Sequence, residues 1–276
     1  MTEPLIMQAR AKARIDDVRQ ALTEPKILNL WLGEHSTVDL PGTFEFWGRY
    51  IPEGDAPHQR VLGYDGQTLK LAWLLGGEET TTEISLLEES DDSTVIKLSQ
   101  SHFKWSEAVS NSNIRGVLQT FWSLALANLV DYLEGRELTP RPDFTSPDLT
   151  GEVLIDAPAA QVFASLTDSA KASAWFGYPV GIDARVGGRF AMGGFEAGPG
   201  MEIVDLVEGQ KMSIDWGLAG ISTWELAESG GKTRLTFVMS GFEGNPPYGA
   251  WLGWLSGVAA LRRYNEQKDW QSIWVA

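Results

Sequence analysis

The sequence predicts an α+β protein of two tandem domains, each a curved antiparallel sheet wrapped on a long C-terminal helix. Three observations support this prediction. The second half of the chain repeats the first half. Each copy contains short runs in which apolar and polar residues alternate, separated by turn residues. Each copy also closes with a long run whose apolar residues recur at helical spacing.

The repeat is clearest between residues 18–33 and residues 162–177. Identical residues recur there at one constant offset, and further matches follow in the same order as the offset shrinks, as loop deletions would cause. The matching pairs are Val18 and Val162, Leu22 and Leu166, Thr23 and Thr167, Trp31 and Trp175, Gly33 and Gly177, Phe46 and Phe190, Trp73 and Trp216, Trp122 and Trp254, and Tyr132 and Tyr264.

A proline-rich segment separates the two copies. Residues 135–151 hold three prolines, polar residues and no apolar period, which is typical of a linker. We therefore predict domains at residues 1–138 and 150–276. Proteolysis is expected to cut first within 139–147, and the second domain is expected to fold alone.

Each copy begins with the same three elements. Residues 5–13 and 152–157 alternate as strands do. A helix follows, and Pro158 is predicted at its first helical position. A second short helix is expected to end near Trp31 in copy one and Trp175 in copy two.

Several strands and the closing helix complete each copy. The turns between the strands are short, so the strands should pair antiparallel with one buried face, which the helix must cover. The residues that share a strand face are Leu69, Leu71, Trp73 and Leu75, then Phe190 and Met192, then Met212, Ile214 and Trp216, then Leu235, Phe237 and Met239. The apolar residues of the closing helices are Ile114, Leu118, Phe121, Ala125 and Leu129 in copy one, and Trp251, Trp254, Leu255, Val258 and Leu261 in copy two.

The composition excludes several classes of protein. A net charge of −15 argues against nucleic-acid binding, which needs a basic face, and disfavours adhesion to anionic membranes. The absence of cysteine excludes disulfides and thiolate metal sites. No apolar run approaches the ~18 residues of a membrane span, and the first ten residues lack a secretory pattern, so we expect a cytoplasmic protein.

Catalytic and metal-binding signals are weak. The histidines are His35, His58 and His102, all in copy one and without helical metal-ligand spacing, so we interpret them as surface residues. There is no G-x-S-x-G motif and no G-x-G-x-x-G motif that opens a helix. We therefore predict no catalytic residue, metal or cofactor.

A carboxylate in an apolar pocket remains an alternative source of chemistry, because burial would raise its pKa toward that of a general base. Asp215 directly precedes Trp216 and should lie on the outer sheet face. Charges in strands usually face solvent. The residues that could lie at a cavity mouth are Glu45, Arg49, Asp183, Arg189 and Glu202.

The aromatic residues are the best functional candidates, because ligand pockets are mostly apolar. An aromatic stripe can also be an ordinary core, and we interpret copy one in that way, with Phe46, Trp73, Phe121 and Trp122 filling its interior. In copy two, methionines add adaptable walls. The predicted ligand-binding residues are Phe190, Met192, Met212, Trp216, Phe237, Met239, Trp251, Trp254 and Val258.

Both copies resemble the SRPBCC superfamily, whose helix-grip fold is shared by lipid-transfer domains and a birch-pollen allergen. They are most similar to the branch of homologues of the activator of the 90-kDa heat-shock protein ATPase. The motifs are Ile155-Asp156-Ala157-Pro158, Leu166-Thr167-Asp168, Trp175-Phe176, Gly187-Gly188-Arg189-Phe190, Gly200-Met201-Glu202-Ile203 and Gly253-Trp254 in copy two, and Ala21-Leu22-Thr23-Glu24-Pro25, Trp31 and residues 128–135 in copy one.

Copy one departs from these motifs at two places. Pro41-Gly42-Thr43-Phe44 stands where the glycine-rich strand start belongs, and Phe121-Trp122 replaces Gly-Trp. The chain also lacks the separate N-terminal domain through which the eukaryotic co-chaperone of this family contacts its chaperone. The resemblance therefore implies the fold and does not by itself imply a chaperone partner.

The leading hypothesis is a non-enzymatic protein that holds a small hydrophobic molecule in a sheet–helix cavity. The alternatives are a cyclase- or hydrolase-like enzyme with a pocket carboxylate, and an interaction module with a protein partner such as a chaperone. Gly249, Gly253 and Gly257 recur along the closing helix of copy two. They either make room for a ligand or permit close packing on a neighbouring element. We predict the larger cavity in copy two.

Overall fold

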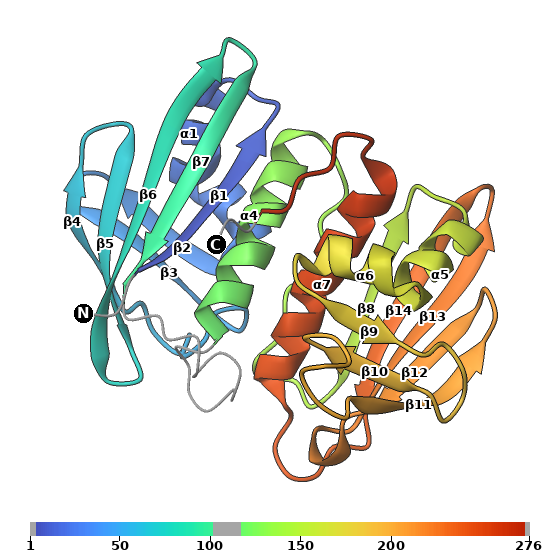
Figure 1. Ribbon diagram of the computed structural model, residues 1–276. Coiled ribbons are helices and arrows are strands. Elements are labelled where there is room, and N and C mark those ends of the chain that lie inside the picture. The colour runs from blue at the N-terminus through green and yellow to red at the C-terminus, as the bar shows by residue number, and fades with distance from the viewer. Residues whose placement is uncertain (1–3, 102–116, 274–276) are drawn as a thin grey trace. The chain divides into compact units, whose positions relative to one another are not determined.

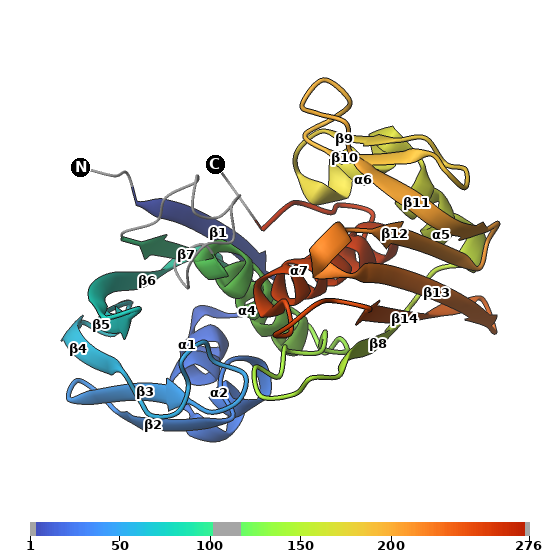
Figure 2. The ribbon, with the colours of Figure 1, turned by 90° about the horizontal axis from the view of Figure 1, so that it is seen from below.

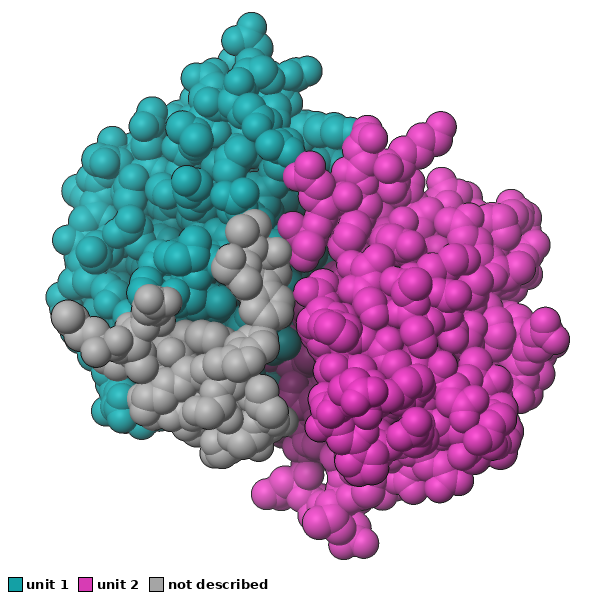
Figure 3. Space-filling view, viewed as in Figure 1, with its two compact units in different colours: residues 1–145, 273–276 teal, residues 146–272 magenta. Residues whose placement is uncertain are grey.

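The computed structural model describes residues 4–101 and 117–273. Its contacts divide the chain into two compact units that meet in sequence between Thr145 and Ser146 (Figure 3). Unit 1 comprises the described residues up to Thr145 together with Ile273, and unit 2 comprises Ser146–Ser272. Two residues of the predictions above, His102 and Ile114, lie outside the described residues.

Within the described residues, unit 1 contains two sheets, three helices and the segment that leads out of its last helix. Its larger sheet has five strands in the order β1-β7-β6-β5-β4, and β2 and β3 form a separate pair. The elements are β1 (Leu5–Ala11), α1 (Ile15–Thr23), α2 (Pro25–Trp31), β2 (His35–Asp39), β3 (Thr43–Trp47), β4 (Gln59–Tyr64), β5 (Thr68–Leu75), β6 (Glu78–Ser90), β7 (Ser93–Gln100) and α4 (Leu118–Leu133) (Figure 1).

Unit 2 repeats this order with one continuous sheet of seven strands, β8-β14-β13-β12-β11-β10-β9. Neighbouring strands are antiparallel throughout, and the curved sheet encloses one side of α7 (Figure 2). The elements are β8 (Leu149–Ile155), α5 (Ala159–Thr167), α6 (Ser169–Phe176), β9 (Val180–Ile182), β10 (Arg189–Met192), β11 (Met201–Val207), β12 (Lys211–Asp215), the short 3₁₀ helix η2 (Gly217–Ala219), β13 (Ile221–Ser229), β14 (Lys232–Ser240) and α7 (Tyr248–Glu266).

The fold class predicted from the sequence is confirmed. Burial alternates along the strands as the apolar pattern requires: β1 and β8 both bury every second residue, starting with the first. The long helices α4 and α7 supply the apolar side chains that cover the inner sheet faces. Each unit is therefore a helix-grip domain.

The two copies differ where β3 and β10 meet the rest of their sheets. In unit 2, Phe190 of β10 pairs with Met201 of β11, which joins β9 and β10 to the large sheet. In unit 1, the backbone N–H of Phe46 in β3 donates instead to the side-chain oxygen of Gln59, at 3.1 Å. A side chain thus replaces a backbone partner, and the sheet of unit 1 is interrupted.

At two positions the sequence prediction and the structure differ by one residue. Pro158 is the N-cap of α5 and not its first helical residue, because its ψ of 146° is extended. Strand β12 ends at Asp215, so Trp216 follows the strand and does not belong to it. The physical reason is local: the Asp215 carboxylate accepts the backbone N–H of Gly217 at 2.8 Å, and this turn starts η2.

The predicted linker is largely part of unit 1. The Asn128 amide of α4 and the backbone of Thr139 exchange two hydrogen bonds of 2.9 and 2.8 Å, and both residues are buried. Arg141 donates to the carbonyl of Gly33 at 2.8 Å. Composition alone could not show this docking, because the partners are distant in sequence.

No helix within residues 4–101 and 117–273 is long and apolar enough to cross a membrane.

Candidate ligand site in unit 2

The interior of unit 2 is organised around Trp254, in the middle of α7. Its ring centroid lies 5.2 Å from that of Trp216, 5.4 Å from Trp224, 5.8 Å from Phe237 and 6.3 Å from Phe190. The interplanar angles of 54–85° are those of tilted and edge-to-face aromatic pairs. The side chain of Trp254 therefore contacts four rings, which come from β10, β13, β14 and the residue that follows β12.

Strand register explains how these rings come together. Trp224 of β13 and Phe237 of β14 are directly opposite each other in the antiparallel ladder, and their rings are 4.5 Å apart. Trp251 lies one helical turn before Trp254 and stacks on Phe237 at 5.2 Å. The inner faces of the strands and the apolar stripe of α7 thus come together in one aromatic cluster.

The cluster is buried on the sheet side and partly open at the end of β12. Trp216 and the neighbouring Phe176 and Tyr178 are partly exposed, whereas Trp224 and Phe237 are fully buried. Burial raises the pKa of the Tyr178 hydroxyl above its ordinary value, and this hydroxyl contacts the sulfur of Met192 at 3.8 Å. The open side therefore presents partly exposed aromatic side chains.

Exposed apolar side chains border this opening. Met192 is 43% exposed, Met201 is 41% exposed and Leu218 is 74% exposed. Met201 pairs with Phe190, and the β11–β12 register places it beside Trp216. We call Met192, Met201 and Leu218 the apolar rim. Exposed apolar groups next to an aromatic interior are typical of binding surfaces.

The predicted site residues separate into two groups. Most of them face the interior between the sheet and α7, whereas Met192 lies on the rim, because strand β10 ends there. The buried residues are Phe190, Met212, Phe237, Met239, Trp251, Trp254 and Val258, and Trp216 is partly exposed.

Sequence reasoning missed several residues of this region. Ser222 alternates with Trp224 on β13 and faces the same interior, so strand period could have identified it. Tyr178, Met201 and Leu218 belong to loops or strand starts, where no period applies. Only the fold places them at the opening.

Residues 156–266 match the family model described as Activator of Hsp90 ATPase homolog 1-like protein. This part of the chain is an AHSA1-like domain. The match includes α5, α6, the aromatic cluster, the apolar rim and the whole of the last helix, α7. The family expected from the sequence is confirmed for this domain.

Several solved structures are similar to parts or all of the chain. CalU16 from Micromonospora echinospora is 24% identical over 50% of this chain and 77% of its own, with a TM-score of 0.37. DynU16 from the dynemicin biosynthetic locus is 14% identical over 95% of this chain and 98% of its own, with a TM-score of 0.39. Aha1 from Colwellia psychrerythraea is 14% identical over 45% of this chain and 99% of its own, with a TM-score of 0.39. No curated protein matches the sequence significantly.

One glycine of the AHSA1-like domain lies at a helix contact. A Cβ atom at Gly257 would lie 3.4 Å from the ring of Trp175, which is an ordinary van der Waals contact, so α7 packs directly against α6 at this position. Gly257 therefore faces a neighbouring element, α6, and an alanine would also fit there. The ligand-room explanation does not apply at this position.

Unit 1 has a comparable aromatic interior. Trp73 lies 5.2 Å from Phe46, 5.6 Å from Phe121 and 5.9 Å from Trp122, and all four residues are buried. These rings fill the space between the sheet and α4. The description of copy one as mainly structural is consistent with this packing.

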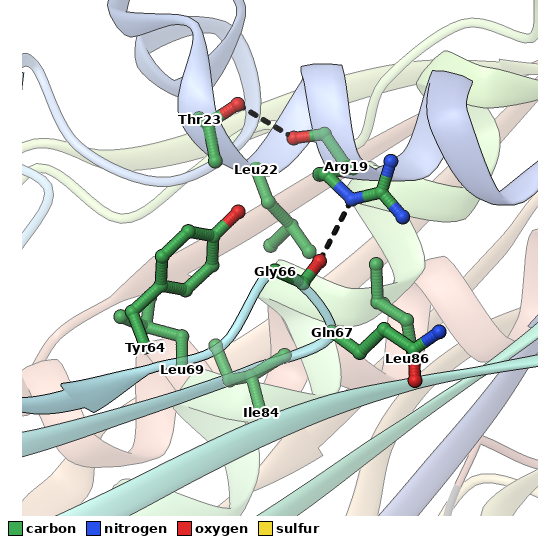
Figure 4. A pocket seen from close by; sticks show the side chains of 9 residues that line it. All are labelled: Arg19, Leu22, Thr23, Tyr64, Gly66, Gln67, Leu69, Ile84 and Leu86. Atoms are coloured by element: carbon green, nitrogen blue, oxygen red, sulfur yellow. Dashed lines mark hydrogen bonds between the residues drawn. The ribbon is translucent and has the colours of Figure 1, made fainter. Parts of the chain in front are cut away.

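A small pocket of unit 1 lies elsewhere, between α1 and strands β4–β6 (Figure 4). Leu22, Leu69 and Ile84 line it, and Arg19 closes one side by donating to the carbonyl of Gly66 at 2.7 Å. Its volume of about 20 Å³ is that of about one water molecule. In the AHSA1-like domain, the rings around Trp254 occupy the interior, so a ligand must displace side chains. The larger cavity expected there stays a prediction.

The acidic and histidine candidates lie away from the aromatic cluster. Asp183 pairs with Arg185 at 2.9 Å, and the Asp215 carboxylate is held by the turn of η2. His58 lies 3.3 Å from Asp55, and this contact lowers the pKa of the Asp55 carboxyl. Within the described residues, no group of three or more histidine and acidic side chains could hold a metal ion.

The remaining charged candidates also make surface contacts. Arg49 pairs with Glu34 at 3.0 Å, and Arg189 lies over the ring of Phe195 at 4.5 Å. Glu202 is exposed, and Glu45 of β3 is half-buried. The structure therefore does not bring these carboxylates to the rings around Trp254.

Proposed function

We propose that this protein is a non-enzymatic binding protein whose AHSA1-like domain holds a small hydrophobic molecule among the rings around Trp254. The molecule reaches the interior past the apolar rim and the partly exposed Trp216. The observation that carries the proposal is the asymmetry of the aromatic cluster, which is sealed by the sheet and open toward exposed methionine and leucine side chains.

Adaptable side chains support binding inside a filled interior. Met212 and Met239 contribute flexible, polarizable groups to the inner sheet face, and methionine repacks around different shapes with little cost. The surrounding tryptophans offer flat apolar surfaces. A ligand would therefore exchange ring–ring contacts for ring–ligand contacts.

The first test is a titration of the full chain with N-phenyl-1-naphthylamine, a neutral apolar fluorophore, followed by tryptophan quenching. We expect saturable binding. Leu218→Glu places a charge on the apolar rim and should weaken binding severalfold. The matched control is Val186→Glu, because Val186 is also exposed, at 59%, but lies in the turn before β10.

Two outcomes would argue against the proposal. Equal weakening by both variants would indicate nonspecific adsorption of the probe. Absence of saturable binding, together with no small molecule released when the purified protein is denatured and analysed by mass spectrometry, would contradict the proposal directly.

The family match favours a second candidate function, binding of a chaperone of the 90-kDa heat-shock class by the same domain. Stimulation of that chaperone's ATPase by the full chain would support it. An enzyme that uses a pocket carboxylate has less support, because the acidic candidates named above lie at surface positions. Proton-transfer chemistry abolished by Glu202→Gln would favour the enzyme.

A further inference from the structure

The two units differ in one buried polar position on the inner sheet face. In unit 1, Thr82 of β6 is paired with Gln100 of β7, and in unit 2 the corresponding strands pair Ser222 with Met239. All four side chains are at most 2% exposed. A hydroxyl is thus opposite an amide in one copy and opposite a thioether in the other.

In unit 1, the side-chain amide of Gln100 accepts hydrogen bonds from two buried neighbours. The Gln100 side-chain oxygen accepts the hydroxyl of Thr82 at 2.7 Å and the indole N–H of Trp122 at 3.1 Å. Two buried donors therefore share one buried acceptor. Such pairing is the usual condition for polar groups inside a protein.

On the inner sheet face of unit 2, the buried donors have no such acceptor beside them. The oxygen of Ser222 accepts the indole N–H of Trp216 at 2.8 Å, and a hydroxyl that accepts still has its own hydrogen to donate. Met239 offers only a weakly accepting sulfur. The indole nitrogen of Trp224, 1% exposed on the same strand face, has no hydrogen-bond partner in the described structure.

Buried donors without acceptors are unfavourable, and a bound molecule can supply what the chain lacks. We propose that the ligand of the AHSA1-like domain is an apolar molecule that carries a neutral carbonyl-type acceptor. Its oxygen takes the place that the Gln100 amide oxygen has in unit 1. Ser222 and Trp224 donate to it, and a carbonyl oxygen has two lone pairs for them. This inference rests on the proposed function.

The acceptor should be neutral. A carboxylate would have to lose its hydration inside an aromatic interior, and burying an unpaired charge is strongly unfavourable. The net charge of −15 also repels anions from the domain. The chemical class is thus a ketone, quinone, lactone or similar compound with an apolar body.

The test compares 9-fluorenone with fluorene, which share one tricyclic skeleton and differ by a carbonyl in place of a methylene. Affinities are measured on the full chain by equilibrium titration. We expect fluorenone to bind about fivefold more tightly, as one neutral hydrogen bond predicts. Fluorenone, but not fluorene, should also shift the indole N–H resonance of Trp224 downfield.

Two variants weaken the preference by different routes. Ser222→Ala deletes one donor. Met239→Gln supplies the acceptor that unit 1 already has, at nearly unchanged side-chain volume. Ser222→Ala should reduce the preference for fluorenone, because only Trp224 still donates, and Met239→Gln should bring the two affinities close to equality, while fluorene binding persists in both variants. The matched control is Gln100→Met, the reverse exchange in unit 1, which should leave the preference unchanged.

The outcomes separate this inference from the proposed function. If neither compound binds, the proposed function fails. If both bind equally to the natural protein, the function stands and the inference is wrong. If Gln100→Met rather than Met239→Gln alters the preference, the carbonyl binds in unit 1, which also overturns it. If either variant fails to fold, the other variant and the Trp224 resonance decide the question.

Discussion

Trp175 donates its indole N–H to the carbonyl of Ser165 at 2.8 Å, which ties the end of α6 to α5. Trp31 makes the same bond to Ala21 at 3.1 Å in unit 1. Both tryptophans are buried, and each lies ten residues after the residue whose carbonyl accepts its hydrogen bond. The repeat visible in the sequence is therefore preserved in individual hydrogen bonds.

A second pair of equivalent bonds closes each domain. Glu134 at the end of α4 accepts the backbone N–H of Lys12 at 3.0 Å, and Glu266 at the end of α7 accepts that of Asp156 at 3.0 Å. Each carboxylate links the last helix to the loop after the first strand. The two ends of each copy are thereby joined in the same way.

Trp175→Ala should lower the free energy of unfolding by about 3–5 kcal/mol, because it removes a large buried side chain and leaves a cavity. Chemical denaturation monitored by circular dichroism measures the change. Leu218→Ala, at a residue that is 74% exposed, is the control and should have little effect. Lost ligand binding with unchanged stability would show that Trp175 belongs to the site and not to the core.

Cleavage of the full chain should occur near Pro147 and Asp148, which are exposed, and not within the docked residues 139–145. Limited proteolysis with mass spectrometry locates the cut. A fragment of residues 146–276 should then unfold cooperatively. A fragment that lacked a cooperative transition would contradict independent folding.

Truncation of unit 1 at residue 138 should destabilise it relative to truncation at residue 145. The shorter fragment loses Thr139, so the buried Asn128 amide loses two backbone partners, which costs about 1–3 kcal/mol. Comparison of the denaturation midpoints of the two fragments measures this. Equal midpoints would show that the docking contributes nothing to stability.

Gly257→Ala should be neutral or stabilising by up to about 0.5–1 kcal/mol, because alanine favours helix and its Cβ would lie 3.4 Å from Trp175. Gly257→Leu should instead destabilise by about 1–3 kcal/mol through overpacking. Thermal unfolding of both variants provides the measurement. A stable leucine variant would mean that space exists beside Trp175 after all.

Stability below pH 4 should depend on Asp65. Its carboxylate accepts the backbone N–H groups of Gln67 at 2.9 Å and Thr68 at 2.7 Å, and these bonds lower its pKa. The folded-state pKa is thus below the unfolded value of about 3.9, so the stabilisation is complete above that pH and is lost as pH falls through the folded pKa.

Asp65→Asn removes this titration. The variant should be less stable than the natural protein at neutral pH, and the difference should shrink on acidification. Denaturation curves at a series of pH values measure the effect. A difference that is constant with pH would show that the Asp65 charge does not hold this turn.

The element order and the core were predictable because their signals are local. Alternation assigned Phe237 to the inner sheet face, and helical spacing placed Trp251 and Trp254 on one stripe of α7. The sequence prediction was wrong where a strand ends and a turn begins from one residue to the next. Trp216 continues the alternation of β12 in sequence, but a turn begins directly after Asp215.

The candidate site was only partly predictable. Its buried rings follow strand and helix periods, but its opening consists of loop residues such as Leu218 and Tyr178. The docking of Thr139 on Asn128 likewise joins a proline-rich segment to a helix interior. No residue pattern within either segment indicates such a partner.

The sequence by itself determined the duplication, the order of strands and helices, and the apolar face of each, because these depend on spacing along the chain. The tertiary structure decided which polar groups find partners. Ser222 and Thr82 occupy equivalent strand positions, yet only Thr82 is opposite an amide acceptor, Gln100. That difference depends on the register between strands, which brings together residues far apart in sequence, and register is a property of the folded sheet.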